Sequence, residues 1–406
     1  MVKPTTADQA LVRKVNTSLV LDALRLRAPI SRAELSARTG LNRSTISSIV
    51  SELINDGFVQ ETNLEDAKIG RPGMLLTLNP RGGFAVGVEI GVDFLSILVT
   101  DFVANGLWRR RVSVDPQLGC DAILQMAAEL TSQALDFGRR ERLNPLGIGI
   151  GVPGLVDINE GKLVFAPNLR WYDIPLRSLW SDRFGLPVFV ENEANAAALG
   201  EYYFGAARGV DNFIYLSAGI GLGGGILIGG RLFRGSNGYG GEVGHMTIQP
   251  DGDLCGCGKR GCWETLVGPR AIVRRVRKTL ETGAVSQISQ MVNGNLKAIT
   301  FETVIEAAQA GDTVALAALD EVAVNLGIGV ANLVNIFNPQ MIVLGGALNL
   351  ASSYLLPAMQ NAVCQNALKP ACQGLSFTGS AHGTDACVMG TIALVLDEIL
   401  REPILA

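Results

Sequence analysis

The chain has 406 residues, of which 48% are hydrophobic and 18% charged, and its formal net charge is -4. This length is too great for one ordinary hydrophobic core, so we expect two or three domains. Residues 1–81 carry 11 Lys and Arg against 8 Asp and Glu, a net charge of +3, which leaves -7 for the remainder. The basic N-terminal part therefore predicts an anionic partner for that part of the chain.

The sequence shows no apolar run of membrane-spanning length, and no basic segment followed by an apolar one at its start. This pattern disfavours a membrane or secreted protein. The expected location is the cytoplasm, and no membrane partner is predicted.

The N-terminal residues predict a winged helix-turn-helix. A first helix is indicated by apolar residues at helical spacing, which are Leu19, Val20, Ala23 and Leu24. Ser31 and Glu34 form a capping box that opens a second, short helix through about Thr39, and Gly40 provides the turn.

A third helix is predicted from Asn42 or Arg43 to about Asp56. Its apolar face consists of Ile46, Ile49, Val50 and Leu53. The opposite side and the first turn hold small hydroxyl residues and one arginine, which can approach base edges without clashing. These candidate DNA-binding residues are Arg43, Ser44, Thr45, Ser47 and Ser48. Residues 58–61 and 74–78 then predict the two strands of a wing.

Apolar strands follow a short link at residues 79–83. Buried strands of one sheet are predicted over residues 84–90, 96–101 and 146–152. Counterparts in a second lobe are predicted over residues 213–216, 224–228 and 341–344. Periodicity alone indicates an α/β body.

Three of the seven cysteines and one of the two histidines lie close together in a glycine-rich stretch: His245, Cys255, Cys257 and Cys262. Thiolates with one imidazole select zinc, and the intervening glycines let a short loop fold back on itself. The spacing predicts a closed, structural, tetrahedral zinc site. Free loop cysteines and a redox pair are the weaker interpretations, the latter because a CxxC spacing is missing.

Two acidic residues flank this cluster, Glu242 before His245 and Glu264 after Cys262. Carboxylates accept paired hydrogen bonds from adjacent hydroxyl groups, so these residues predict a sugar site. The segments Glu242-Val-Gly-His245 and Cys255-Gly-Cys-Gly-Lys-Arg-Gly-Cys-Trp-Glu264 resemble, position for position, the signature of the ROK family of repressors and sugar kinases.

The resemblance implies a winged helix-turn-helix followed by a two-lobed actin-like, sugar-kinase body of the ribonuclease H-like kind. We expect a DNA-binding domain over residues 1–80 and a first lobe over 81–195, completed by about 380–406. The second lobe, with the zinc and sugar-binding elements, is expected over 196–379. In the repressors that this sequence resembles, Gly-Arg-Pro sits at the wing, which implies that Arg71 enters a minor groove.

The resemblance also implies the sugar contacts. Residues 191–195 resemble the family's Glu-Asn-Asp-Ala-Asn, in which the asparagine and aspartate bind sugar hydroxyls and the aspartate is the kinase's general base; here Glu193 replaces that aspartate. Gly154 and Asn168 match segments that line the family's sugar cleft. The expected sugar-binding residues are Gly154, Asn168, Asn192, Glu193, Glu242, His245 and Glu264.

The two phosphate loops depart from those of the kinases. Where the first loop reads Asp-x-Gly-Gly-Thr, this chain has Val92 and Asp93 at the last two positions. Where the second reads Gly-Thr-Gly, this chain has Ile220 at the centre. A carboxylate repels a triphosphate, and Val92 adds a side chain where backbone should approach phosphate. We therefore predict no catalytic residues and no kinase activity.

The resemblance implies a sugar-responsive transcriptional repressor with xylose or glucose as effector. The chain looks most similar to the xylose-repressor branch of the family, because Glu-Asn-Glu-Ala-Asn and a winged helix with Gly-Arg-Pro recur together there. We expect a homodimer or a dimer of dimers on a palindromic operator, since one recognition helix per subunit gives two half-sites. Two alternatives stay open: an active ATP-dependent sugar kinase with an accessory DNA-binding domain, and a repressor controlled by a partner protein.

Overall fold

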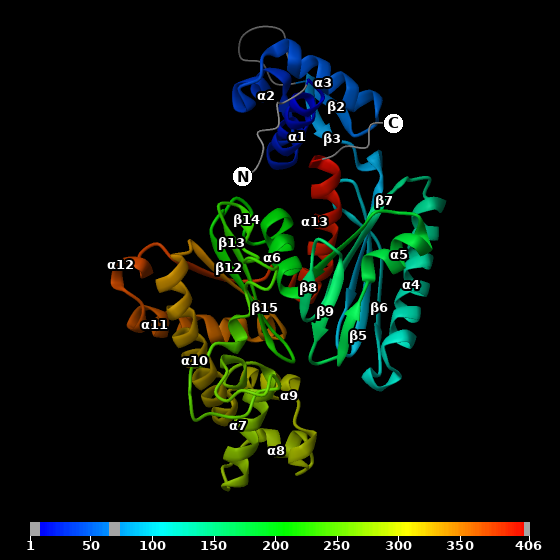
Figure 1. The fold of residues 1–406 in the computed structure, drawn as a ribbon. Coiled ribbons are helices and arrows are strands. Elements are labelled where there is room, and N and C mark those ends of the chain that lie inside the picture. Colours follow the sequence, from blue (N-terminus) through cyan, green and yellow to red (C-terminus); the bar gives the residue numbers. More distant parts are fainter. Residues whose placement is uncertain (1–8, 65–73, 402–406) are drawn as a thin grey trace.

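A computed structural model describes residues 9–64 and 74–401 of the chain. These residues form a small winged-helix module followed by a body built around two five-stranded sheets (Figure 1). The α/β architecture expected from the sequence is confirmed. Arg71, the predicted wing residue, lies outside the described residues.

The winged-helix module contains three helices and a small sheet. The helices are α1 (Gln9–Arg27), α2 (Arg32–Thr39) and α3 (Arg43–Asn55), and the sheet has the order β1 (Ile30–Ser31), β3 (Met74–Leu78), β2 (Val59–Leu64). As predicted, the Ser31 hydroxyl accepts a hydrogen bond from the Glu34 amide at 3.3 Å, and Gly40 ends α2 with a φ of 72°. The Asn42 side chain caps α3 by accepting from the Thr45 amide at 2.8 Å.

The prediction for the buried face of the first helix is wrong at one position. Leu19 is 44% exposed, whereas Leu21, which was not predicted, is buried together with Val20 and Leu24. Leucines lie on several sides of α1, so the apolar pattern did not single out the face that packs. The predicted buried face of α3 is confirmed in full.

The first sheet of the body has the order β11-β7-β4-β5-β6. Its strands are β4 (Phe84–Ile90), β5 (Phe94–Asp101), β6 (Gly106–Ser113), β7 (Pro145–Val152) and β11 (Val188–Asn192). Strand β4 is buried along its whole length and is apolar except for Glu89, whereas β6 is a largely exposed edge. The helices α4 (Cys120–Arg140) and α5 (Leu176–Phe184) pack on this sheet, and β8 (Leu155–Asp157), β9 (Lys162–Ala166) and β10 (Trp171–Ile174) form a small antiparallel sheet beside it.

The second sheet has the order β14-β13-β12-β15-β16. Its strands are β12 (Phe213–Ala218), β13 (Leu222–Ile228), β14 (Arg231–Leu232), β15 (Met341–Gly346) and β16 (Ser376–Gly379). The accompanying helices are α7 (Pro269–Glu281), α8 (Gln287–Met291), α9 (Phe301–Gln309), α10 (Thr313–Phe337), α11 (Ser352–Asn366) and α12 (Lys369–Cys372). One core joins this sheet to the buried faces of α7, α9, α10 and α11.

Helix α10 corrects one expectation drawn from the sequence. Among the described residues it is the single helix whose length and composition would allow it to cross a membrane, so the statement that no apolar run reaches that length is wrong. More than half of its most apolar window is buried inside the protein, where it packs along α11. The apolar composition of α10 is therefore accounted for by the core.

Two helices, α6 (Glu193–Phe204) and α13 (Ala386–Arg401), lie between the two sheets of the body. Helix α13 packs on the first sheet, α6 packs on the second, and the two helices pack on each other. Their backbones touch, because a Cβ atom on Gly390 would lie 1.6 Å from the carbonyl oxygen of Ala196, and one on Gly200 would lie 2.6 Å from that of Ala386. Figure 1 shows α13 extending from the body to the winged-helix module.

Candidate functional site

The four predicted metal ligands converge. The Sγ atoms of Cys255, Cys257 and Cys262 and a ring nitrogen of His245 all lie within 4.8 Å of one another. The Sγ atoms of Cys257 and Cys262 are 3.6 Å apart, and Cys255 Sγ is 3.7 Å from His245 Nδ1. A tetrahedral ion with bonds of about 2.3 Å to sulfur and about 2.0 Å to nitrogen requires ligand separations of roughly 3.5 to 3.8 Å. The cluster therefore has the donor types and the dimensions to bind a metal ion.

The loop that carries these ligands is shaped by its glycines and anchored by one aromatic residue. Gly261 has a φ of 71°, and a Cβ atom there would lie 1.6 Å from the Gln249 carbonyl oxygen, so no other residue fits. Trp263 directly follows Cys262, is fully buried, and donates from Nε1 to the Asn325 carbonyl oxygen at 3.0 Å. This anchor fixes the loop to α10.

The two flanking carboxylates face the histidine from different sides. His245 Nδ1 lies 3.7 Å from Glu264 Oε1, and His245 Nε2 lies 4.0 Å from Glu242 Oε2. Glu264 also accepts from the Cys255 thiol at 2.7 Å and from the Leu222 amide at 3.3 Å. Since Nδ1 faces the cysteines, a metal bound there would leave the Nε2–H group directed toward Glu242.

Helix α6 begins at the predicted sugar residues Asn192 and Glu193. The Asn192 side chain caps the helix by accepting from the Ala194 and Asn195 amides at 2.9 and 3.2 Å, and it donates to the Gly154 carbonyl oxygen at 2.9 Å. One N–H of the Asn192 carboxamide is left over for a ligand. Gly154 itself has a φ of 106°, and a Cβ atom there would lie 2.2 Å from the Phe165 carbonyl oxygen, so backbone packing alone requires glycine.

The structure links the remaining predicted sugar residues to this centre. A Cβ atom on Gly221 would lie 2.8 Å from Glu264 Oε2 and 3.9 Å from Asn168 Nδ2, so Asn168 and Glu264 converge on the same turn. Burial, together with the nearby charge of Glu242, raises the pKa of Glu193 to about 7. The carboxyl groups of Glu193 and Glu242 therefore interact electrostatically, although they come from different segments.

A second buried acid lies close to Glu193. Burial, and then the charge of Glu193, raise the pKa of Glu89 to about 8. One carboxyl oxygen of Glu89 is buried without a hydrogen-bond partner among the described residues. Buried acids with raised pKa values are common at functional sites, where binding of a ligand can compensate the free-energy cost of burying them.

The first phosphate loop is covered by a side chain that the sequence analysis missed. The Phe94 ring lies over Gly91 so closely that a Cβ atom on Gly91 would be 2.3 Å from a ring carbon. The Arg111 guanidinium stacks on the same ring, 3.6 Å from its centre, and donates to the Thr384 carbonyl oxygen at 3.4 Å. No spacing rule marks an aromatic residue as a cover for a loop, so only the structure reveals it.

Two further residues of the centre carry no signal apart from the Glu-Asn-x-Ala-Asn motif. Glu191 is buried and forms an ion pair with Arg234 at 2.8 Å. Its carboxylate also accepts from the Asn195 side chain at 3.1 Å. Asn195 Oδ1 is buried without a partner among the described residues, which makes it a candidate acceptor.

The predicted DNA-binding residues form one surface on α3, with one exception. Arg43, Ser44, Ser47 and Ser48 are exposed, whereas Thr45 is partly buried. Ser44 donates to the Asn42 side chain at 2.7 Å, and Arg13 of α1 donates to Ser48 at 3.4 Å. The hydroxyls of Ser44 and Ser48 would exchange these contacts in order to bind a phosphate or a base edge.

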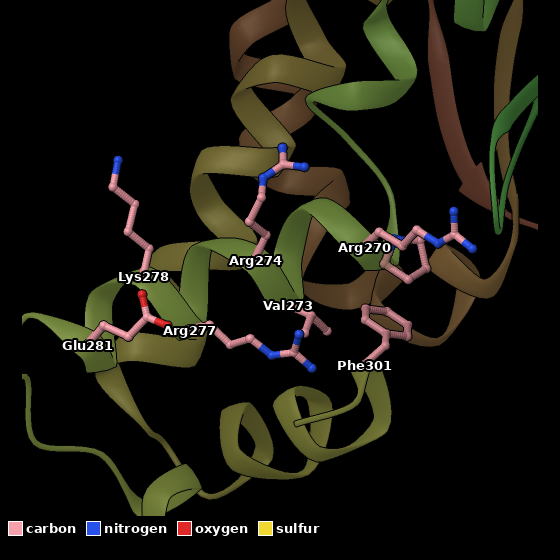
Figure 2. A pocket seen from close by; sticks show the side chains of 8 residues that line it. Arg270, Val273, Arg274, Arg277, Lys278, Glu281 and Phe301 are labelled. Carbon is pink, nitrogen blue, oxygen red and sulfur yellow. The ribbon is translucent and has the colours of Figure 1, made fainter. Parts of the chain in front are cut away.

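A separate groove of about 680 Å³ lies along α7 (Figure 2). Its lining residues include none of the predicted metal or sugar residues. Figure 2 shows the guanidinium groups of Arg270, Arg274 and Arg277 lying apart from one another, so they do not converge on one ligand. Arg274 donates a hydrogen bond to the Thr265 carbonyl oxygen at 2.7 Å, and Arg277 donates one to the Ile299 carbonyl oxygen at 2.9 Å. We assign the functional centre to the residues around His245 and Glu193 instead.

Known proteins resemble the chain over nearly its whole length. The xylose repressor of Caldicellulosiruptor bescii is 36% identical over 396 residues, which are 98% of this chain and 99% of the relative. A solved ROK family transcriptional regulator, a homologue of the E. coli MLC protein, gives a TM-score of 0.84 at 28% identity over 97% of this chain and 98% of its own. A ROK family glucokinase from Streptomyces griseus, solved with glucose and AMPPNP, gives 0.68 at 33% identity over 77% of this chain and 99% of its own.

Family models agree with these relatives. The ROK family model matches residues 85–398, and a winged helix-turn-helix DNA-binding model matches residues 16–60. The resemblance to the xylose-repressor branch is also confirmed. The chain belongs to the ROK family and carries an N-terminal winged helix-turn-helix.

Proposed function

We propose that this protein is a transcriptional repressor whose affinity for operator DNA changes when a monosaccharide binds. The observation that carries the proposal is the similarity to a xylose repressor over 98% of the chain, which includes both the winged helix and the body. In this proposal the exposed side of α3, with Arg43 and Ser47, reads base edges in a major groove, and Arg71 reaches a minor groove. Sugar binding relieves repression.

The proposed effector is xylose or glucose, bound between the two lobes. Its hydroxyl groups would donate to the carboxylates of Glu193, Glu242 and Glu264 and meet the carboxamides of Asn168 and Asn192. His245 would donate from Nε2, and Gly154 would provide a wall without a side chain. The convergence of these groups from five separate segments supports the assignment.

The proposed metal is zinc, held by His245, Cys255, Cys257 and Cys262. Support comes from the thiolate and imidazole donors and from their tetrahedral separations. Four protein ligands complete the coordination, so the role is structural. The ion would hold the loop in which Glu264 follows Cys262 by two residues.

We propose that the chain has no kinase activity. Val92, Asp93 and Ile220 stand where the kinases have phosphate-binding residues. The cover of Phe94 over Gly91, backed by Arg111, adds support because a phosphate must approach that backbone closely. Glu193 then serves as an acceptor for a sugar hydroxyl rather than as a general base.

The proposal extends to assembly and location. A homodimer, or a dimer of dimers, would place two α3 helices on a palindromic operator in the cytoplasm. The domains are proposed as residues 1–80, 81–195 with about 380–406, and 196–379. The position of α13 against the first sheet supports the return of the C-terminal segment to the first lobe.

Replacing Arg43 with alanine should reduce the discrimination between operator and random DNA by ~1 to 3 kcal/mol, because a bidentate base contact is lost. Fluorescence anisotropy with both DNAs at one salt concentration measures this difference. Arg110→Ala removes an exposed arginine from β6 and controls for the lost charge. Equal weakening on both DNAs in Arg43→Ala would contradict base reading by this residue.

Elemental analysis of purified protein should find about one zinc ion per chain. Cys262→Ser should lose the ion and weaken sugar binding more than operator binding, since the loop with Glu264 loosens. Cys120→Ser changes a partly buried cysteine outside the cluster and should keep the ion. A zinc content in Cys262→Ser equal to that of the parent would refute the ligand assignment.

Sugar affinity should increase between pH 6 and pH 8. The pKa of Glu193 is raised to about 7, so its carboxylate, the better acceptor for a hydroxyl, becomes populated over this range. The increase should approach about tenfold per pH unit below pH 7. Calorimetric titrations of sugar into the parent and into Glu193→Gln would test this. Glu89 is present in both proteins, so a difference between their pH profiles reports on Glu193. An identical pH profile in the two proteins would exclude Glu193 as the titrating acceptor.

The protein should form no sugar phosphate when it is incubated with ATP and a panel of monosaccharides. A coupled ADP assay and mass spectrometry of the sugars provide the readout. Turnover at roughly 1 to 1,000 per second that requires both sugar and Glu193 would establish the kinase alternative instead.

A further inference from the structure

Helices α6 and α13 both connect the sugar-binding centre to the winged-helix module. The first turn of α6 holds Glu193, and its last turn holds Tyr203. The first turn of α13 holds Cys387, which lies near the buried Glu89, and its last turns hold Asp397. Each helix therefore has one end at the centre and the other near α1 of the winged-helix module.

These two helices pack so closely that neither can shift toward the other. The contact of Gly390 with the Ala196 backbone leaves no space for a methyl group. In addition, the buried carboxylate of Glu201 on α6 accepts hydrogen bonds from the Ser380 hydroxyl and from the His382 amide at 3.1 Å, in the segment that leads into α13. A shift at the start of α6 would therefore displace Tyr203 and Asp397 together.

Arg25 of α1 contacts the C-terminal parts of both helices at the same time. Its guanidinium lies 4.0 Å above the centre of the Tyr203 ring, and Nη1 is 3.7 Å from Asp397 Oδ1. The Tyr203 hydroxyl donates to the same Asp397 oxygen at 2.6 Å, and Asp22 holds Arg25 Nη2 at 2.8 Å. The Arg25 backbone carbonyl accepts from Arg208, which follows α6, at 3.4 Å.

The interaction of Arg25 with Tyr203 and Asp397 is more sensitive to the relative position of the helices than an ordinary surface ion pair is. The side chains of Arg25 and Asp397 are only 16% and 18% exposed, so water screens their interaction weakly. Arg25 Nε is buried and has no partner among the described residues. A planar guanidinium can stack on a ring and face a carboxylate together only in a narrow range of positions. Displacement of α6 and α13 relative to α1 would break both contacts.

We propose that Arg25 is the positioning residue through which the winged-helix module responds to sugar. It holds α1 against Tyr203 and Asp397 in only one of two states, the sugar-free or the sugar-bound protein. This inference rests on the proposed function, because it concerns how sugar binding at the start of α6 changes operator affinity. Arg25 contacts neither the sugar-binding residues nor the exposed side of α3. Its effect is on the coupling between the two sites.

The test measures operator affinity of the full-length protein with and without saturating D-xylose or D-glucose, and sugar affinity by calorimetry. Coupling between sites usually amounts to about 5- to 150-fold, and in Arg25→Ala we expect the operator affinity ratio to fall to within about threefold of 1. Sugar affinity without DNA should remain close to that of the parent. Arg25→Lys keeps the charge without the planar group and should restore the ratio only in part.

Two further variants separate coupling from a general loss of stability. Arg27→Ala removes an exposed arginine from the same helix and should keep the parent ratio. Tyr203→Phe keeps the ring but removes the hydroxyl bond to Asp397, so it should lower the ratio while preserving the fold, even if Arg25→Ala does not fold. A parent-like ratio in Tyr203→Phe and in any folded Arg25 variant would overturn the inference. Failure of both sugars to bind or to act on the parent would instead overturn the proposed function.

Discussion

The backbone contact between α6 and α13 is the constraint on which the rest of the structure depends. Each helix covers the inner side of one sheet, so the two lobes meet through this pair. Gly390 and Gly200 allow the helices to approach until backbone touches backbone, and any larger residue would force them apart. A cleft that opens or closes must therefore move these helices as rigid elements rather than deform them.

The same arrangement explains why the functional centre lies where it does. The start of α6 places Asn192 beside Gly154 and Glu193 within electrostatic reach of Glu242. The segment with the candidate metal ligands places Glu242 and Glu264 beside His245. Burial first, and then the neighbouring carboxylates, raise the pKa values of Glu89 and Glu193, so their charged forms are costly to keep in this centre. A ring of hydroxyl groups that donates to these carboxylates would offset that cost, which links sugar binding to lobe position.

The features of the fold and the candidate site that could be predicted are those that leave a recognisable pattern in a short stretch of sequence. The four candidate metal ligands are close in sequence and chemically distinctive, and they converge in the structure as expected. The strands of the body are rich in apolar residues and lie close to their predicted bounds. The face of α1 was misjudged at Leu19 because leucines surround that helix. The cover of Phe94 over Gly91 and the contacts of Arg25 with Tyr203 and Asp397 carry no local pattern. The contact of Phe94 with Gly91 depends on the conformation of the turn between β4 and β5, and the contacts of Arg25 arise from packing between distant segments. A single sequence encodes neither in readable form.

Thermodynamic linkage gives the most direct test of the central claim, that one protein binds sugar and operator DNA at coupled sites. The affinity of the full-length protein for D-xylose, and separately for D-glucose, would be measured by calorimetry with and without saturating operator DNA. If sugar relieves repression, operator must weaken the binding of the effector sugar by the same factor by which that sugar weakens operator binding. Sugar affinity that is identical with and without operator would contradict the account.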